Sequence, residues 1–439
     1  MIEKRKTCPT MSEAIESAMQ ALVECGHRPV FLFVGNSVLH IAALNAFLLM
    51  LRNEGVEVCG VICDNIPSDR VPQYDERDVF AVDADKFVLL RNEIDYYKPG
   101  QTVSARIKSS LHPNLPQQAC NKDAITSYKD SFFLIATDED YPSLELWKAA
   151  STQGLQVKCI LVEEGIGSYL SRESAHRLFA LKEAGIARRI KRAAKERILA
   201  LFRARYRSAL DGRCTIERFS AYDRSPDGRL VPNKDFIFWM KQSLQQYSRA
   251  KGINDPDFSG RVVIVGTNFQ ELGDESLERA FLERIACVIE ACGLRPYLRP
   301  HPRSRSIERY KEAGIEVDEF GKVPFEAVLS ASKAMPVAMI GLGSSSQLLA
   351  NTFWGIPCFN VAPILVDEAK EKGSMTQIMR AFGRRATQFS RAFSGCMPLV
   401  DDNETLRRFL LIAVRKKEER VSARSLNGSG LKAHSYGRK

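Results

Sequence analysis

The chain has 439 residues, of which 45% are hydrophobic and 26% are charged. This is ordinary globular composition, and it excludes a disordered or fibrous chain. With 63 Lys and Arg against 53 Asp and Glu, the formal net charge is +10, which favours an acidic partner but does not choose among nucleotides, anionic glycans, nucleic acid and lipid surfaces. The 11 cysteines show no paired metal-ligand spacing, and no apolar segment directly follows the charged N-terminus, so we expect reduced thiols and a cytoplasmic protein.

Short apolar runs alternate with longer helical patterns in the first half of the chain. Residues 30–51 carry no charge and are long enough to span a bilayer, but the central Gly35-Asn36-Ser37 predicts a buried strand, a turn and a helix. Further strands are predicted at 56–63, 79–82, 86–90, 132–136 and 157–162, with helices that include 39–52 and 143–152. This alternation predicts a parallel, doubly wound sheet.

A second series of strands and helices begins at residue 261. Its predicted strands are 261–266, 295–299, 334–340 and 357–361, and its predicted helices are 276–292 and 345–354. The fold class is therefore α/β, with two Rossmann-like domains facing each other across a cleft and the ligand at the carboxyl ends of the strands.

The chain is predicted to divide into four segments. An N-terminal domain covers 20–215, a linker covers 216–259, a C-terminal domain covers 260–414, and a basic tail covers 415–439. Turn residues around a single helical piece mark the linker. The tail is poor in apolar residues, so we expect it to be disordered.

Glu163-Glu164-Gly165 directly follows an apolar strand. Two carboxylates at the carboxyl end of a strand can include one with a raised pKa, which is suited to a general base. The alternative is that they are acidic residues in the first turn of a helix.

A second group of residues, Arg299-Pro300-His301-Pro302, also follows a strand. Prolines fix the backbone on both sides of the histidine, and nearby arginines suit an anionic phosphate to which histidine could donate. A rigid turn that bears a surface histidine is the alternative. A second His-Pro pair, His112-Pro113, lies elsewhere in the chain.

The third group runs from Gly341-Leu342-Gly343 into Ser344-Ser345-Ser346 and then a predicted helix. Backbone N–H groups and hydroxyls at a helix N-terminus form an anion site without a metal. Simple capping of the helix by one serine is the alternative.

No metal site is predicted. The D-x-D triplets at 83–85, 138–140 and 255–257 could hold a divalent ion, but we interpret all three as polar turns.

Residues 187–207 contain nine basic side chains and an apolar stripe at helical spacing. This pattern indicates a helix that lies on an anionic membrane or guides a polyanionic glycan, and a solvated helix packed by one face is the alternative. Nucleic acid is not expected as a partner, because no nucleic-acid-binding motif accompanies the arginines.

The three groups, in this order, resemble the motif set of bacterial sialyltransferases and polysialyltransferases with the GT-B architecture. Those enzymes carry a D/E-D/E-G motif in an N-terminal acceptor domain, followed by an HP motif and a serine-rich motif in a C-terminal donor domain. Val323-Pro324-Phe325-Glu326, between the HP and serine segments, agrees with a softer feature of these families. The acidic pair is Glu-Glu where Glu-Asp is common, so either member could be the base.

The resemblance implies an inverting, metal-independent glycosyltransferase that moves sialic acid from CMP-sialic acid to an anionic or sialylated glycan acceptor. It implies a membrane-associated protein at the inner membrane surface, where capsule or lipooligosaccharide is built, with contact through 187–207. Glu163 or Glu164 would be the base, and His301 would donate to the departing phosphate. The implied donor-binding residues are Gly266, Thr267, Asn268, Arg299, Pro302, Glu326, Gly343, Ser344, Ser345 and Ser346.

Two alternatives stay open on the sequence. One is a Kdo or glycerol-phosphate transferase with a CMP- or CDP-activated donor. The other is a basic protein that binds nucleic acid or membranes without catalysis. If the protein is a sialyltransferase, no cofactor is expected, because CMP-sialic acid is its donor substrate.

Overall fold

The computed structural model describes nine separate ranges of the chain. These are residues 29–34, 38–54, 59–64, 87–91, 118–119, 132–136, 157–162, 214–224 and 230–430, the last with gaps at 268, 270–274, 302–309, 311–313, 322 and 394. The chain divides into two compact units. The first unit comprises Met1–Tyr169, Glu183–Asn254 and Lys322–Ala331, and the second comprises Leu170–Lys182, Asp255–Gly321 and Ser332–Lys439.

The first unit is built on a parallel sheet. Its strands are β1 (Pro29–Val34), β2 (Cys59–Asp64), β3 (Phe87–Arg91), β4 (Gln118–Ala119), β5 (Phe132–Ala136), β6 (Val157–Val162) and β7 (Cys214–Phe219). Within the described residues their order is β3-β2-β1-β5-β6-β7-β4, and every pairing is parallel. Because β1 lies between β2 and β5, it has no edge exposed to water, which explains its continuous apolar sequence. The predicted strand at 79–82 lies outside the described residues.

The uncharged stretch at 30–51 forms β1 and helix α2 (Val38–Asn53), as predicted for a strand and a helix. Residues Ala42–Leu44, Ala46–Leu48 and Leu51 of α2 are buried. The polar Asn45 is also buried, and its side-chain amide donates to the Ser243 hydroxyl at 3.0 Å, so its burial is compensated by a hydrogen bond. No helix within the described residues is long and apolar enough to cross a bilayer.

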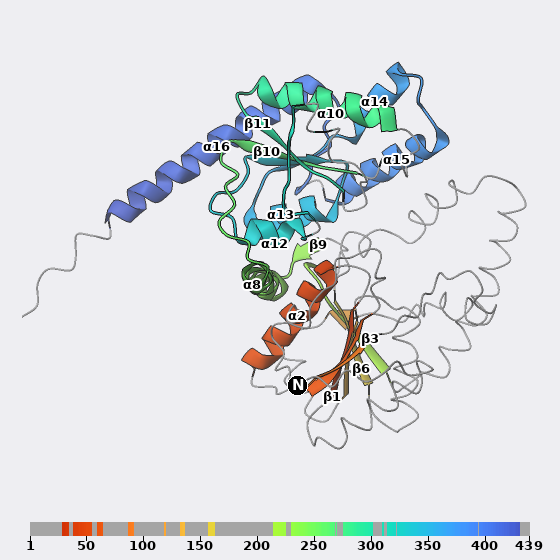
Figure 1. Ribbon diagram of the computed structural model, residues 1–439, viewed down its shortest axis with the longest axis vertical. Helices are drawn as coiled ribbons and strands as arrows, with labels where there is room; N and C mark the ends of the chain where they lie inside the picture. Colours follow the sequence, from red (N-terminus) through yellow and green to blue (C-terminus); the bar gives the residue numbers. More distant parts are fainter. Residues whose placement is uncertain are drawn as a thin grey trace, which may run out of the picture. The chain divides into compact units, whose positions relative to one another are not determined.

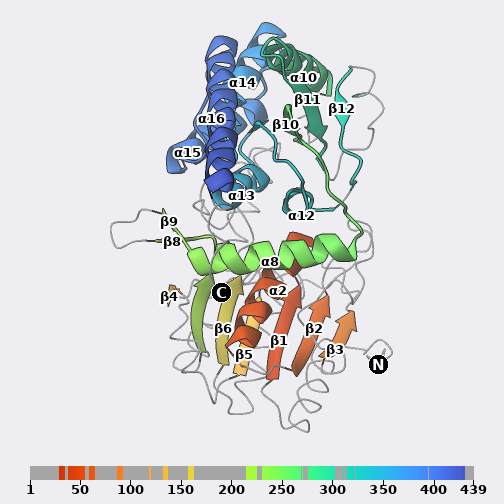
Figure 2. The same cartoon turned by 90° about the vertical axis from the view of Figure 1, so that its left-hand side faces the viewer.

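The segment 216–259, expected to be a linker, is instead largely part of the first unit. It holds the end of β7, the hairpin strands β8 (Tyr222–Arg224) and β9 (Leu230–Pro232), and helix α8 (Lys234–Ala250). Phe236, Met240, Leu244 and Tyr247 recur at helical spacing and are buried. Figure 2 shows α8 beside α2. Turn residues lie only at the ends of this helix, where Asn233 caps its first turn. The predicted linker boundaries were therefore wrong, because they were based on these turn residues.

The first unit also contains a short segment from much later in the chain, Lys322–Ala331. Helix α12 (Phe325–Ser330) was expected in the C-terminal domain, but it groups with the first unit and packs against α8. The Ser248 hydroxyl of α8 lies 2.9 Å from the Ser330 hydroxyl. The sequence carries no sign of this return, because it depends on a contact between residues about 80 positions apart.

The second unit contains a smaller parallel sheet, visible with its covering helices in Figure 1. Its strands are β10 (Arg261–Val265), β11 (Arg295–Arg299), β12 (Glu316–Val317), β13 (Ala338–Gly341) and β14 (Cys358–Asn360), in the order β12-β11-β10-β13-β14 among the described residues. The helices are α10 (Glu275–Glu290), α13 (Ser345–Trp354), α14 (Ala362–Glu371), α15 (Gln377–Ala392) and α16 (Asn403–Gly430). Two parallel, doubly wound sheets confirm the predicted α/β class.

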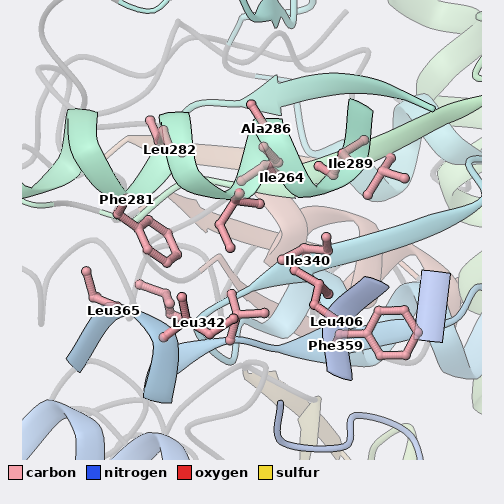
Figure 3. Close-up of a cluster of buried hydrophobic side chains, with 14 of the residues drawn as sticks. Ile264, Phe281, Leu282, Ala286, Ile289, Ile340, Leu342, Phe359, Leu365 and Leu406 are labelled. Atoms are coloured by element: carbon pink, nitrogen blue, oxygen red, sulfur yellow. The ribbon is translucent and has the colours of Figure 1, made fainter. Parts of the chain in front are cut away.

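The core of the second unit lies between this sheet and its helices. Figure 3 shows Ile264 and Ile340, from neighbouring strands, packed with Phe281 and Leu282 of α10. Leu406 of α16 belongs to the same cluster. The alternating pattern of buried strand and half-buried helix is what the sequence periodicity indicates.

The basic tail is also different from its prediction. Residues 415–430, expected to be disordered, form the end of α16, and 431–439 lie outside the described residues. Leu406, Leu410 and Ala413 bury one face of this helix, and the Lys417 ammonium donates to the Met335 carbonyl at 2.6 Å. The charged residues that follow are good helix formers, so a helix anchored at its start can continue through them.

Candidate functional site

Strand order places a candidate site in the second unit. The chain runs outward from β10 through β11 to β12, then returns to the other side of β10 with β13 and β14. In open parallel sheets, ligands bind at the carboxyl ends of the strands where this reversal occurs. Here that position lies between the residues that follow β10 and those that follow β13.

The residue after β10, Gly266, is in close contact with the loop after β11. Its amide donates to the Arg299 carbonyl at 2.8 Å. A Cβ atom on Gly266 would lie 2.8 Å from the His301 amide nitrogen and 2.9 Å from the Arg299 carbonyl oxygen, both backbone atoms. Only glycine allows this approach, which brings the half-buried Thr267 and His301 to the same edge of the sheet.

After β13, a glycine turn leads into the capped helix α13. Gly343 has φ +86°, a conformation that side chains other than glycine rarely adopt. The Ser344 hydroxyl accepts from the Gln347 amide, and the Gln347 side-chain oxygen accepts from the Gly343 and Ser344 amides, each at 3.2 Å. Ser344 is therefore the N-cap of a capping box, while Ser345 and Ser346 occupy the first turn.

This cap leaves the helix terminus suited to an anion. Gln347 is fully buried and neutral, and its side-chain amide donates to the Phe359 carbonyl at 2.9 Å. A glutamate at the same position of a capping box would add a negative charge, whereas glutamine adds none. Within the described residues, the half-buried Ser346 hydroxyl makes no hydrogen bond. The positive end of the helix dipole and this hydroxyl therefore lie near the strand ends.

Gly341 allows Gln347 to reach the turn. A Cβ atom on Gly341 would lie 2.6 Å from the Gln347 side-chain oxygen and 3.2 Å from the Cβ of Val265, the last residue of β10. The ends of β10 and β13 are thus in contact. Gln347 was not among the predicted residues, although the spacing Ser344-x-x-Gln347 is a recognised capping-box pattern that could have identified it.

Arg299 has a different environment from the one expected. Its guanidinium forms a buried ion pair with Asp318, and the Tyr297 hydroxyl donates to the other carboxylate oxygen at 2.9 Å. Burial raises the pKa of Tyr297 to about 12, so this hydroxyl keeps its proton at neutral pH. Arg299 is only 7% exposed. The pair fixes the end of β11, which carries His301, and direct binding of a donor by Arg299 stays a prediction.

Replacing Arg299 by methionine should lower the free energy of unfolding by about 3–5 kcal/mol, because it leaves the buried Asp318 charge without its cation. Urea denaturation measures this change, and a loss below about 1 kcal/mol would contradict the structural role. The double variant Arg299→Met/Asp318→Asn removes the charge and keeps an acceptor for Tyr297, so it should regain most of the stability. CMP affinity that stays low in the stable double variant would assign a donor contact to Arg299.

The described part of the second unit does not contain several of the candidate residues. Glu163, Glu164, Asn268 and Pro302 are outside the described residues, as is the basic segment 187–207. Glu326 is buried in the first turn of α12, in the first unit. The described structure therefore assembles Gly266, Thr267, His301 and the turn 343–346, and it does not test the acidic pair.

The D-x-D triplets are described in part. At 255–257, Asp255 has φ +44°, Asp257 forms an isolated parallel bridge with Ala334, and the Asp257 carboxylate accepts from the Ser259 amide at 2.7 Å, so the turn lies two residues later, at 259–260. The other two triplets lie outside the described residues. Among the residues that are described, no three His, Cys, Asp or Glu side chains come together as metal ligands.

The fold and this site place the chain among α/β proteins that carry nucleotide-binding-type parallel sheets. Residues 124–362, more than half of the chain, match the profile of the family described as alpha-2,8-polysialyltransferase. The chain belongs to this family, and it is accordingly a glycosyltransferase of the sialyltransferase class. The matched region includes Glu163-Glu164-Gly165, His301-Pro302 and the serines 344–346.

The solved structures that this chain matches include the following three. An alpha/beta-galactoside alpha-2,3-sialyltransferase from Photobacterium phosphoreum is 14% identical, with a TM-score of 0.45 over 85% of this chain and 98% of that one. A UDP-GlcNAc 2-epimerase from Methanocaldococcus jannaschii is 13% identical, with a TM-score of 0.41 over 89% and 92%. MurG from Acinetobacter baumannii is 10% identical, with a TM-score of 0.38 over 88% and 94%. No curated protein gives a significant match to the sequence.

Proposed function

We propose that the protein transfers sialic acid from CMP-sialic acid to a glycan acceptor, with inversion at the anomeric carbon and without a metal ion. The observation that carries this proposal is the contact between Gly266 and the backbone of His301, beside the glycine turn and capped terminus of α13. An imidazole, serine hydroxyls and a helix N-terminus at one sheet edge suit a nucleotide phosphate.

The chemistry divides between activation of the acceptor and departure of the nucleotide. The acceptor oxygen attacks the anomeric carbon, and the bond from that carbon to the phosphate oxygen breaks with its electrons on CMP. His301 donates a proton or a hydrogen bond to the departing phosphate, and hydroxyls of Ser344–Ser346 hydrogen-bond its oxygens. Glu163 or Glu164 accepts the proton of the acceptor hydroxyl. A single displacement of this kind inverts the anomeric centre.

Metal independence follows from this set of groups. Each charge that develops on the phosphate meets a neutral or cationic hydrogen-bond donor, which is the task that a divalent ion performs in other phosphate sites. We further propose that the acceptor is an anionic or sialylated glycan of capsule or lipooligosaccharide. The basic segment 187–207 would hold the enzyme against the inner membrane surface where such glycans are made.

The choice of donor is tested by release of the nucleotide. Purified protein is incubated with CMP-sialic acid, CMP-Kdo or CDP-glycerol, each with a lactoside acceptor, with and without excess EDTA. We expect CMP release and a sialylated product only with CMP-sialic acid, at the same rate in EDTA. NMR of the product should show an anomeric configuration opposite to that of the donor.

Three results would contradict the proposal in different ways. Turnover of CMP-Kdo or CDP-glycerol alone would reassign the donor. Loss of activity in EDTA, with recovery on adding a divalent ion, would return the D-x-D triplets to consideration. Retention of the donor's anomeric configuration would replace the single displacement by a double one.

A further inference from the structure

Helices α14 and α15 of the second unit border a groove of about 720 Å³. The described residues that line it lie between Pro363 and Arg391, beyond the end of the region that matches the family profile. None of these lining residues is part of the candidate donor site at the strand ends. Its lining includes the apolar side chains of Pro363, Val366 and Met375.

A row of arginines runs along the α15 side of this groove. Arg380, Arg384 and Arg391 line it, together with Thr387, and these positions follow one another at i, i+4, i+7 and i+11. This spacing places them on one face of the helix. At 1.5 Å per residue the row is about 16 Å long, which is much longer than a single phosphate or carboxylate.

Within the described part of the chain, no acidic side chain pairs with this row of arginines. Lys370 on α14 pairs with Asp367 at 2.7 Å, so these two lining charges offset each other. Arg380, Arg384 and Arg391 are exposed, and within the described part of the chain their side chains have no ion pair. Three guanidinium groups on one face repel each other unless an anion binds between them.

The two helices can pack closely because α15 has a glycine, Gly383, where it meets α14. A Cβ atom on Gly383 would lie 2.9 Å from a methyl carbon of Val366, so glycine allows α15 to pack tightly on α14. The Thr387 hydroxyl donates to the Gly383 carbonyl at 3.0 Å within the same face. The groove is thus formed mainly by two packed helices, and Met375 of the loop between them contributes to its lining.

We propose that this groove binds an extended anionic glycan that carries several carboxylates, separately from the donor site. Guanidinium groups bind carboxylates through paired hydrogen bonds, and the apolar lining residues suit the C–H faces of sugar rings. Among the side chains that the structure describes, no aromatic one lines the groove to stack on a base, which argues against a nucleotide or single-stranded nucleic acid. The identity of the glycan, a growing sialic acid chain, rests on the proposed function.

Such a site would retain the product between additions. A chain anchored in the groove keeps its end at a high effective concentration near the enzyme, so successive additions outcompete dissociation. The groove would therefore control the length of the product, and the first addition to a short acceptor would not need it.

The test measures binding of α-2,8-linked oligosialic acid of one defined length to the full chain by calorimetry, without any donor. The variant is Arg380→Gln/Arg384→Gln/Arg391→Gln. The matched control is Arg407→Gln/Arg408→Gln/Arg415→Gln, which removes the same charge from exposed positions of α16 in the same unit. We expect affinity to fall at least about tenfold in the groove variant and less than about twofold in the control. Unfolding midpoints identify any variant that fails to fold, and in that case Arg384→Gln alone should still weaken binding.

Product analysis separates this inference from the proposed function. The groove variant should add the first sialic acid to a short acceptor at the wild-type rate but make shorter products. If the groove and control variants lose the same affinity for oligosialic acid, the effect comes from net charge alone, and the proposed site is wrong. The site would also be wrong if the wild-type chain does not bind oligosialic acid, or if the groove variant weakens binding of single-stranded RNA only. If no donor is turned over while the groove still binds the glycan, the proposed function fails and the site stands.

Discussion

Replacement of His301 by alanine should lower kcat for transfer from CMP-sialic acid by about 10²–10⁴-fold, the usual contribution of a positioned general acid. His301 lies directly after β11, where the contact with Gly266 fixes its backbone, and it is the side chain in the described site that can carry a proton to the phosphate. Steady-state kinetics with saturating donor measure the effect.

The chain supplies its own control for this variant. His112 is also followed by proline, lies outside the described residues and is not one of the proposed site residues, so His112→Ala changes the same dipeptide at another position of the chain. We expect wild-type kcat for that variant. A kcat for His301→Ala within about twofold of wild type would remove the proton-donor role.

The second large effect is expected from Gly266→Ala, which adds a single methyl group. Its Cβ would lie 2.8 Å and 2.9 Å from backbone atoms of His301 and Arg299, and backbone cannot move aside as a flexible side chain can. The loop that carries His301 must therefore shift. A displacement approaching 1 Å costs about 100-fold in rate, and the crowding should destabilise the fold by about 1–3 kcal/mol.

Gly260→Ala is the matched control, because it lies at the other end of β10. Gly260 has φ +65° with nothing within 4 Å of a Cβ, so alanine adds backbone strain of about 1–2 kcal/mol without a collision. Both variants should lose stability, but only Gly266→Ala should lose kcat. If both lose kcat in proportion to stability, the contact between Gly266 and His301 has no special role in catalysis.

Much of the sheet architecture could be predicted from the sequence because buried parallel strands leave a strong local signal. The apolar runs at 132–136 and 157–162 became β5 and β6 without change, and the uncharged stretch at 30–51 became β1 and α2. The order of the strands does not follow from such runs. The strand order depends on contacts between distant segments. It is this order that shows where the chain reverses direction beside β10.

The elements that sequence reasoning misplaced are those whose structure is decided by tertiary contacts. Helix α8 looked like the centre of a linker because turn residues surround it, yet its periodic apolar face packs on α2 and α12. The helical part of the predicted tail depends on anchoring residues earlier in α16. In both cases local composition was outweighed by burial of a face at helical spacing.

For the site, the structure gives the local contacts of some of the predicted residues, and their roles in binding and catalysis stay predictions. The serine segment was predicted to bind an anion or to cap a helix, and the structure shows that Ser344 is the cap and that Ser345 and Ser346 follow it. Arg299 was expected to contact the donor, but its guanidinium pairs with Asp318, a partner 19 residues away that no motif marks. Roles of this kind depend on where a side chain points, which motif spacing does not encode.

The most direct test of the account is a crystal structure of the full chain with CMP bound. We predict that the phosphate lies within hydrogen-bond distance, about 2.7–3.2 Å, of the His301 side chain and of a backbone or hydroxyl group in Ser344–Ser346. A phosphate that contacts neither, for instance one held by the arginine row of the α14–α15 groove, would contradict the assignment of the donor site.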